Sequence, residues 1–477
     1  MLNHWSIVPV FVVGFLFINL ILGLRAAKGV HTVSDHVVGG RGLGFLLVFF
    51  TSIGEIYSSV AFLGQPGWAY EHGVTIIANV GVFIGLTGFW LGPKIWEAGH
   101  ARGYMTQAQF LGDRYQSELL RGLVAVMGVI ALVAYISIQM MGGGYVFEVT
   151  TEGHIPFWLG SLLAFGTVAI YVATGGLRAI GWVAVLKGFF MAAVGIYIVV
   201  RVVGEFYGGL PAMFAEIAAR SPAHLTLPGP KGFATYAWTA SSLLNGVLAF
   251  YMWPHMFSNF YSAQNPRIIR RQAVLIPLYN IITLSFTMVG FAGILVLHNI
   301  RPDTVMVEML KKIAPMWLIG LFCAGALSAS MVTGAACSLA AAATIGNDLL
   351  QPRFRWSEHG LKTRIQWLVL VVIAIAYSIA LMRPGMMVYI ILIAYGVTGQ
   401  MLPGVLASFY RPSVRSHSVI TGIVAGFVVI VVMVAKIVEA PGNTHPGIIA
   451  LAVNFLVVWL MEVFRKDTAL VTPVSSN

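Results

Sequence analysis

Residues 49–73 read FFTSIGEIYSSVAFLGQPGWAYEHG, an apolar stretch that is long enough to cross a bilayer but is interrupted twice. The letters GEIYSS at 54–59 break its first half, and GQPG at 64–67 breaks its second half. Backbone at membrane depth is irregular only where it is buried in protein or lines a cavity. The stretch therefore predicts a discontinuous helix at a binding site, which is a pattern of secondary transporters.

The composition places this stretch in a membrane protein. Of the 477 residues, 58% are hydrophobic and only 9% are charged, whereas soluble domains carry about 25% charged residues. The net charge of +11 is expected to reflect cytoplasmic loops rather than nucleic-acid binding. Cys323 and Cys337 lie fourteen positions apart in one apolar run, so we expect two buried thiols without a disulfide. No metal-ligand or haem spacing occurs, and neither a metal nor a cofactor is expected.

Hydropathy predicts an all-α polytopic membrane protein with thirteen transmembrane helices in a single domain over residues 1–477. The expected core covers about 45–409, with flanking helices at 7–24, 419–437 and 447–464. The thirteen predicted spans are 7–24, 45–70, 74–92, 119–146, 156–173, 180–203, 236–257, 273–297, 315–343, 365–382, 386–409, 419–437 and 447–464.

The basic residues predict the orientation of these spans. Most of the 28 Lys and Arg residues fall in the loops after the odd-numbered spans and in the C-terminal tail. The positive-inside rule then places the N-terminus outside and the C-terminus in the cytoplasm. We expect a multi-pass protein of a bacterial-type inner membrane, with short helices in the external loops near 205–222 and 299–314.

A second interrupted span mirrors the first. Residues 250–257 read FYMWPHMF, and a proline inside a helix removes a backbone hydrogen bond and bends or opens it. The two interrupted spans are the second and the seventh. This separation of five predicts an inverted five-plus-five repeat whose broken helices meet at the bilayer midplane.

Two ionisable residues fall deep inside predicted spans, namely Glu55 and Lys187. Charged groups in the membrane usually face a cavity or a partner and have a function. The functional interpretation is that one or both change protonation during transport. The alternatives are that Glu55 lies close to the interface and that Lys187 is a structural amine bonded to the carbonyls of a broken helix.

The ninth span is rich in small residues, which permits close helix packing. Ala329 and Thr333 are four positions apart on one face of it. The Ala329 carbonyl and the Thr333 hydroxyl are oxygen ligands suited to a hard cation. The alternative is that Thr333 bonds only its own helix backbone.

Four motifs resemble the sodium/solute symporter family, and together they extend over about residues 38–350. They are VVGGRGLG at 37–44, TQAQFLGDRY at 106–115, GGLRAIGW at 175–182 and WPHMFSNFYSAQNPRIIRR at 253–271. The WPH version is most similar to the branch with monocarboxylate and other organic-acid permeases. The resemblance implies a LeuT-type core preceded by one extra helix and followed by two.

The family's principal sodium site uses carbonyls of the first core helix and a carbonyl with two hydroxyls on the eighth. The resemblance carries this ligand set over to Gly54, Tyr57, Ala329, Val332 and Thr333. The sequence departs from the family pattern at four of its positions. Val332 replaces a hydroxyl ligand, Ala184 replaces an Asp, Lys187 replaces a Gln, and Ile56 replaces an Asp beside Glu55.

These departures weaken the sodium site, because they remove oxygen ligands and add an ammonium group one turn from Ala184. Proton-coupled relatives of the same core place a Lys at a similar position. We therefore expect H⁺ coupling, or no coupling with Lys187 replacing the cation. Sodium symport of another small solute, such as an amino acid, a sugar acid or a vitamin, remains the alternative.

The sequence thus predicts a secondary active transporter that imports a small organic solute, most simply a short carboxylate. Exposed amides near the two breaks are expected to receive the carboxylate. The predicted substrate-binding residues are Glu55, Ser58, Ser59, Gln65, Gln139, Asn245, Tyr251 and Trp253, and the predicted ion or coupling site consists of Gly54, Tyr57, Lys187, Ala329 and Thr333. The expected partners are the solute and membrane lipid, with a monomer or weak oligomer.

The sequence disfavours three other classes of protein. A transporter-like membrane sensor is disfavoured because the tail at 465–477 is too short for a signalling domain. A channel is disfavoured because no span is continuously polar. An enzyme is disfavoured because no nucleophile–base pair stands out.

Overall fold

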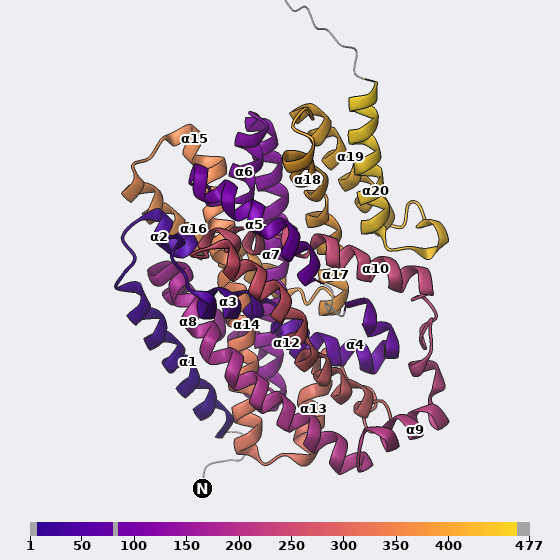
Figure 1. Cartoon of the computed structure of the whole chain (residues 1–477). Helices are drawn as coiled ribbons and strands as arrows, with labels where there is room; N and C mark the ends of the chain where they lie inside the picture. The colour runs from indigo at the N-terminus through magenta and orange to yellow at the C-terminus, as the bar shows by residue number, and fades with distance from the viewer. Residues whose placement is uncertain (1–6, 80–83, 465–477) are drawn as a thin grey trace, which may run out of the picture.

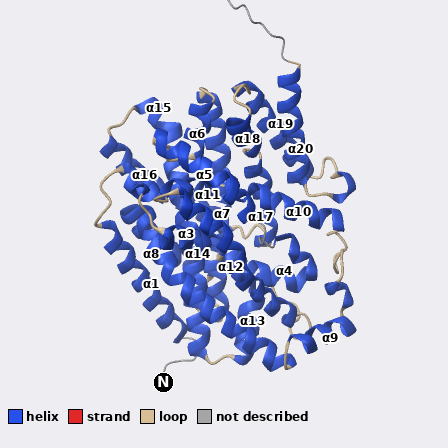
Figure 2. Ribbon diagram, in the orientation of Figure 1, coloured by secondary structure: helices blue, strands red, loops and turns tan. Residues whose placement is uncertain are grey.

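The computed structural model describes residues 7–79 and 84–464, with the side chain of Glu55 outside the description. This part of the chain is helical throughout (Figure 2). Its one β feature is an isolated bridge between Leu43 and Ala263. The prediction of an all-α protein is confirmed for the described residues.

Nine helices in the described ranges are long and apolar enough to cross a membrane. They are α1 (Ile7–Ala27), α7 (Glu118–Thr150), α8 (Phe157–Tyr207), α12 (Pro266–Gly293), Met316–Phe354, α16 (Glu358–Leu381), Met387–Tyr410, α19 (Ser416–Val434) and α20 (Pro446–Val463). Met316–Phe354 comprises α14 (Met316–Thr344), the π-helix η9 (Ile345–Leu350) and α15 (Gln351–Phe354). Met387–Tyr410 comprises α17 (Met387–Gly399) and α18 (Leu402–Tyr410).

Both predicted interruptions are present. The first span consists of α3 (Phe45–Ile56), the π-helix η3 (Val60–Gly64) and α4 (Gln65–His72), with a non-helical Tyr57 at φ −82° and ψ 64°. The second consists of α10 (Tyr236–Ala249), the 3-10 turn η7 (Phe250–Met252) and α11 (Pro254–Ser262). Trp253 is extended at φ −61° and ψ 132°, because a residue before proline avoids the helical region.

The predicted spans 156–173 and 180–203 form one element, α8, of 51 residues. A straight helix of that length would extend for about 75 Å, more than twice the hydrocarbon thickness of about 30 Å. The element is broken instead at Gly176, where φ is +53° and ψ is −146°. The carbonyl oxygen of His36, in α2 (Val33–Val38), lies so close that a β-carbon at Gly176 would be 2.2 Å from it.

The predicted third span at 74–92 is wrong in its bounds. Residues 73–79 form the 3-10 helix η4 (Gly73–Asn79), and the long helix is α5 (Gly85–Arg102). Lys94, which was expected in a loop, lies on α5 with its ammonium 4.8 Å from the ring centre of Tyr410. Hydropathy missed the second half of α5 because its polar residues occupy one face of a helix that packs against α12 and α11 (Pro254–Ser262) on another.

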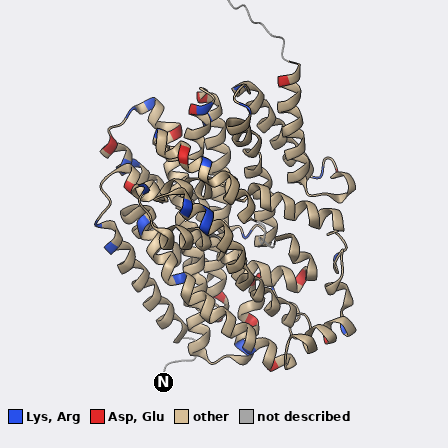
Figure 3. Ribbon diagram, in the orientation of Figure 1, with Lys and Arg blue, Asp and Glu red and all other residues tan. Residues whose placement is uncertain are grey.

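The two ends of the bundle differ in their short helices (Figure 1). The expected external helices are α9 (Leu210–Arg220) and α13 (Val305–Ile313), and both lie at the end where the chain begins. At the opposite end lie α6 (Gln107–Arg114), α15 and α18. Figure 3 shows that charged residues gather mainly toward these two ends.

The most buried long helix is α14, which packs against α7, α8 and α1. Its small side chains allow this close approach on all sides. α14 therefore carries Ala329 and Thr333 in the protein interior, next to the break in the α3 helix.

Candidate functional site

The break after α3 leaves backbone oxygens available to side chains. The last carbonyls of a helix have no partner within it, and α3 ends at Ile56. At Gly54 the carbonyl oxygen accepts two hydrogen bonds from other helices. One comes from Nζ of Lys187 on α8 at 2.8 Å, and the other from Oγ1 of Thr333 on α14 at 2.8 Å.

The Lys187 ammonium joins the broken helix to α14. Its Nζ also donates to the Ala329 carbonyl oxygen at 3.0 Å, and the Lys187 side chain is 0% exposed. Thr333 Oγ1 lies 3.3 Å from the same Ala329 oxygen. Four of the five predicted coupling-site residues, Gly54, Lys187, Ala329 and Thr333, are thus brought together by direct hydrogen bonds.

The two apolar replacements predicted beside this cluster lie against Gly54. A β-carbon added to Gly54 would be 2.8 Å from Cγ1 of Val332 and 3.5 Å from Cβ of Ala184. Methyl groups therefore lie next to Gly54 at two positions where the family residues would carry a hydroxyl and a carboxylate, which are cation ligands. Tyr57, the fifth predicted residue, is buried and packs against Tyr279 with the ring centres 4.9 Å apart and the rings tilted by 49°.

A cavity opens beside the break, on the α4 side of it. Its volume is about 50 Å³. Tyr135 on α7 donates to Ser58 Oγ at 3.4 Å across its wall. The lining residues are Ile56, Ser58, Val60, Ala61, Gln65, Asn79, Ile84, Tyr135, Phe250, Asn280, Ile391 and Tyr395. None of these side chains carries a formal charge at neutral pH, so the lining offers hydroxyl, amide and aromatic groups for contact with a solute.

The predicted solute-binding residues fall into two groups. Ser58 and Gln65 line the cavity, and Trp253 borders it through ring contacts with Tyr135 at 5.1 Å and Tyr395 at 5.6 Å. The side chain of Glu55 lies outside the described residues, although its backbone belongs to α3.

The other four residues lie outside the cavity lining. Gln139 caps the break, because its Oε1 accepts the Ser59 N–H at 3.0 Å. The Ser59 hydroxyl faces Gly142 of α7, where an added β-carbon would be 2.1 Å away. Tyr251 packs on Phe260 at a ring-centre distance of 4.8 Å, and Asn245 packs against Gly447 of α20. Polar residues at a helix break hydrogen-bond free backbone groups and pack against neighbouring helices as readily as they bind a ligand.

Three polar lining residues that sequence reasoning missed come from long apolar helices. They are Tyr135 on α7, Asn280 on α12 and Tyr395 on α17. An Asn in an apolar helix indicates from sequence that the residue faces a cavity or a polar partner. The sequence does not show whether that partner is the cavity or another helix.

A second cavity lies on the α6 side of the Lys187 cluster. Its volume is about 30 Å³. Thr51, Ala336 and Ala340 in its wall lie one or two turns from Gly54 and Thr333 toward α6. Its polar lining residues are Thr51, Thr106, His255, Ser258 and Asn259. The Lys187 ammonium thus has one cavity on its α4 side and the other on its α6 side.

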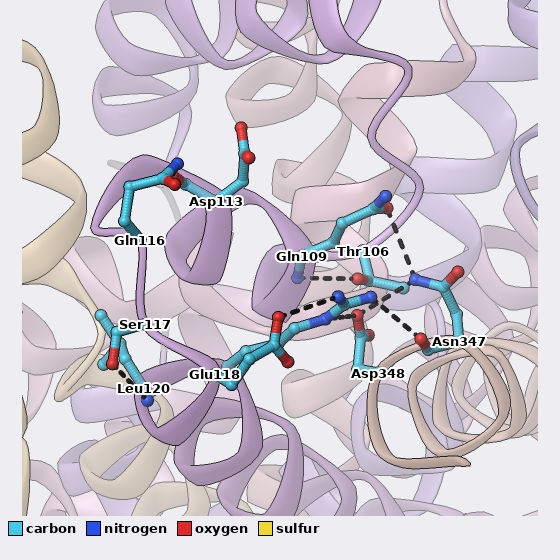
Figure 4. A network of polar contacts seen from close by, with 10 residues as sticks. Thr106, Gln109, Asp113, Gln116, Ser117, Glu118, Leu120, Asn347 and Asp348 are labelled. Carbon is cyan, nitrogen blue, oxygen red and sulfur yellow. Dashed lines mark hydrogen bonds and ion pairs between the residues drawn. The ribbon is translucent and has the colours of Figure 1, made fainter. Parts of the chain in front are cut away.

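A charged network closes the α6 end of the bundle (Figure 4). Arg121, at the start of α7, donates from Nε to the buried Asp348 Oδ1 at 2.9 Å and from Nη2 to the Asn347 carbonyl at 2.9 Å. Asn347 Nδ2 donates to Asp348 Oδ1 at 3.0 Å and lies 3.5 Å from Gln109 Oε1 of α6. The sequence analysis singled out neither Arg121 nor Asp348, so this contact between α7, α6 and η9 was missed.

Two broken helices, with a polar cavity beside the break and a second cavity on the other side of the Lys187 cluster, form an arrangement typical of helical secondary transporters. The model of the sodium:solute symporter family matches residues 36–437. The chain therefore belongs to the sodium:solute symporter family, and it is a multi-pass membrane transporter rather than an enzyme.

Relatives and solved structures agree with this assignment. The chain is 29% identical to the uncharacterized symporter YhjB of Bacillus subtilis over 96% of this chain and 97% of that protein. It is 25% identical to a monocarboxylate transport permease protein of Rhizobium johnstonii over 67% and 65% of the two chains. Its fold matches that of a Na⁺-coupled sialic acid symporter with a TM-score of 0.80 at 15% identity, covering 96% of this chain and 98% of the other.

Proposed function

We propose that this protein imports a short carboxylate by alternating access and that the Lys187 ammonium replaces the sodium ion of its relatives. The observation that carries the proposal is the pair of hydrogen bonds from Lys187 Nζ to the Gly54 and Ala329 carbonyl oxygens at 2.8 and 3.0 Å. These oxygens belong to the two helices that supply the family's principal sodium ligands.

A sodium ion and this ammonium cannot share the site. Two unit charges about 4 Å apart repel by about 4 kcal/mol at an effective dielectric constant of 20. Val332 and Ala184 place methyl groups next to Gly54, so the site also has fewer oxygen atoms with which to offset the dehydration of sodium.

The ammonium permits two modes of coupling. A lysine that releases its proton to the cavity on the α6 side breaks the link between α3 and α14, and the inward flow of protons then drives solute import. A lysine that keeps its proton acts as a fixed cation, and transport is then downhill. The first mode gives proton symport and the second gives a uniporter.

The substrate assignment depends on the cavity and on one relative. Ser58 and Tyr135 present hydroxyl groups, and Gln65, Asn79 and Asn280 present amides. These groups hydrogen-bond a carboxylate while Phe250 and Tyr395 cover its apolar part. The relative from Rhizobium johnstonii, named as a monocarboxylate permease, supports the same class of solute.

We further propose an architecture for this transporter. It consists of thirteen crossings arranged as an inverted five-plus-five repeat over about 45–409, with one helix before it and two after it. The N-terminus lies outside, the C-terminus lies in the cytoplasm, and the membrane is a bacterial inner membrane. The protein acts as a monomer or weak oligomer.

Sodium symport is the competing function. The family is named for sodium-coupled transport, and the structural neighbour is a Na⁺-coupled sialic acid symporter.

Uptake into proteoliposomes distinguishes sodium symport from the proposed function. Labelled acetate, pyruvate and lactate are offered under an inward sodium gradient, an inward proton gradient, or neither, with choline as the balancing cation.

Under the proposal, the sodium gradient leaves the uptake rate unchanged. In the proton-symport mode the parent accumulates solute under the proton gradient and Lys187→Ala abolishes this accumulation, whereas in the uniporter mode the proton gradient has no effect. Solute exchange without a gradient persists in Lys187→Ala, whereas the exposed-lysine control Lys312→Ala behaves like the parent protein. Strong sodium stimulation would overturn the coupling proposal. No uptake of any of the three acids would overturn the substrate proposal.

A further inference from the structure

The segment between α12 and α14 contacts the outer half of the broken helix. It contains the 3-10 turn η8 (Pro302–Thr304) and α13, which lies at the same end of the bundle as α9 (Figure 1). η8 packs directly on α4 and also contacts η3. A β-carbon at Gly67 of α4 would be 2.6 Å from the Pro302 oxygen and 2.9 Å from the Asp303 nitrogen, so the two backbones touch. We call residues 294–315 the outer segment.

Asp303 places a carboxyl group inside this contact. The residue is 2% exposed, and its carboxyl group accepts the backbone N–H of Met387, the first residue of α17. No residue in the described part of the chain hydrogen-bonds the other oxygen, Oδ1. α17 contributes Ile391 and Tyr395 to the solute cavity, so this carboxyl group connects the outer segment to a wall of that cavity.

Asp303 also lacks a hydrogen-bonded cation among the described residues. Its neighbour Arg301 donates instead to the Tyr145 hydroxyl of α7, and its guanidinium lies 5.0 Å from the centre of that ring. Burial therefore dominates, and it raises the pKa of Asp303 to about 7 even though the Met387 N–H and the Arg301 charge act in the opposite direction.

The other titratable groups on the elements around η8 are paired or remote from this carboxyl group. On α7, Glu148 binds Arg383 at 2.6 Å. On α4, Glu71 binds Lys231 at 2.9 Å, and burial lowers the pKa of His72 to about 4. On α13, Glu308 faces Lys311 at 3.7 Å. The elements also carry Tyr70 on α4, Glu118, Arg121, Tyr135 and Tyr145 on α7, Lys312 on α13, and Tyr389 and Tyr395 on α17, whereas η3 (VAFLG) has no titratable residue.

We propose that Asp303 is a proton-binding site and that the proton it takes from the external solution holds the outer segment against α4 and α17. A neutral carboxyl group is accommodated in the buried contact, whereas the carboxylate needs water or a cation that the contact does not supply. Protonation therefore favours the docked outer segment shown here, and ionisation favours its release.

The sign of the pH dependence follows from the raised pKa. The docked form binds the proton more tightly than a released form in which Asp303 is solvated. Docking is thus complete below the pKa of the solvated carboxyl group and weakens as the pH rises toward the pKa of the docked one, above which it falls no further. Between these two pKa values, the one proton lowers the docked-to-released ratio by about tenfold per pH unit.

Distance measurements between two spin labels test this proposal in the full-length protein in lipid nanodiscs. The labels are attached to Lys312→Cys on α13 and Tyr389→Cys on α17, both exposed positions. Cys323 and Cys337 are buried and do not take up label. The expected result is one distance at pH 4 and a second, separate population that grows as the pH rises to about 7 and levels off above that value.

Two variants and a control make the result decisive. Asp303→Asn keeps an acceptor for the Met387 N–H without a charge, so it stays docked at every pH. Asp303→Glu keeps a titration with a displaced midpoint, and the control Glu308→Gln titrates like the parent. A parent with no pH response, or an Asp303→Asn variant that titrates like the parent, overturns the proposal.

The inference rests on alternating access but not on the role of Lys187. The measurement needs no solute and no sodium gradient, so sodium-driven uptake would remove the coupling proposal and leave this one standing. Conversely, a pH-independent distance would remove the Asp303 site without affecting the lysine cluster.

Discussion

Restoring the family residues around Gly54 should convert this protein into one that binds sodium. The perturbation is the triple variant Ala184→Asp, Lys187→Gln, Val332→Ser. It removes the ammonium from the Gly54 and Ala329 carbonyl oxygens. It also adds a carboxylate and a hydroxyl at two positions whose side chains lie next to Gly54. The site then offers a cation several oxygen ligands and a compensating negative charge.

The expected gain follows from mass action. Sodium at about 100 times its dissociation constant stabilises the form that binds it by about 2.7 kcal/mol. A chain of 477 residues has an unfolding entropy of about 1 kcal/mol per degree near the midpoint. The melting temperature of the triple variant should therefore rise by about 3 °C in saturating sodium.

The assay compares melting temperatures in sodium chloride and choline chloride at equal ionic strength. The parent should show no difference between the two salts, because its carbonyl oxygens already accept hydrogen bonds from Lys187. Lys312→Gln, which removes an exposed lysine, serves as the control and should behave like the parent. A sodium-specific rise in the parent as large as that in the triple variant would refute the reasoning.

Three further substitutions test the packing and hydrogen bonding described above. Gly54→Ala forces a β-carbon to 2.8 Å from Val332 and should cost about 1–3 kcal/mol of unfolding free energy; the added change Val332→Ala should recover most of the lost melting temperature. Thr333→Val removes the 2.8 Å hydrogen bond to Gly54 and should cost about 0.5–1.5 kcal/mol; a melting temperature equal to the parent's would contradict that contact. Arg121→Ala leaves the buried Asp348 carboxylate without its cation and should cost about 3–5 kcal/mol, part of which Asp348→Asn should restore if the loss is electrostatic.

The broken helices were predictable from the sequence because local chemistry causes them. Gly and Ser interrupt an apolar helix at 54–59, and Pro254 forces an extended backbone at Trp253. The bounds of α5 were not predictable by hydropathy, because the second half of that helix combines a packed face with a polar one.

The lysine cluster was predictable in part. A lone Lys in an apolar span demands partners, and the family resemblance indicated which carbonyls were available. The sequence left a structural amine as an alternative. The structure gives the distances, while the role of Lys187 in coupling stays a proposal.

Asp303 and Asp348 were missed for a common reason. Each stands beside polar or charged residues in the sequence, which is typical of a solvated loop or helix end. Their burial comes from elements distant in the chain, namely α17 for Asp303 and the start of α7 for Asp348. Contacts of this kind depend on tertiary packing, so a local sequence pattern does not predict them.

An experimental density map of the protein in nanodiscs with 100 mM sodium chloride tests the central claim most directly. The account predicts continuous density from the Lys187 side chain to the carbonyl oxygens of Gly54 and Ala329. A lysine turned away from α14, with a separate ion bound by Gly54, Ala329 and Thr333, would contradict it.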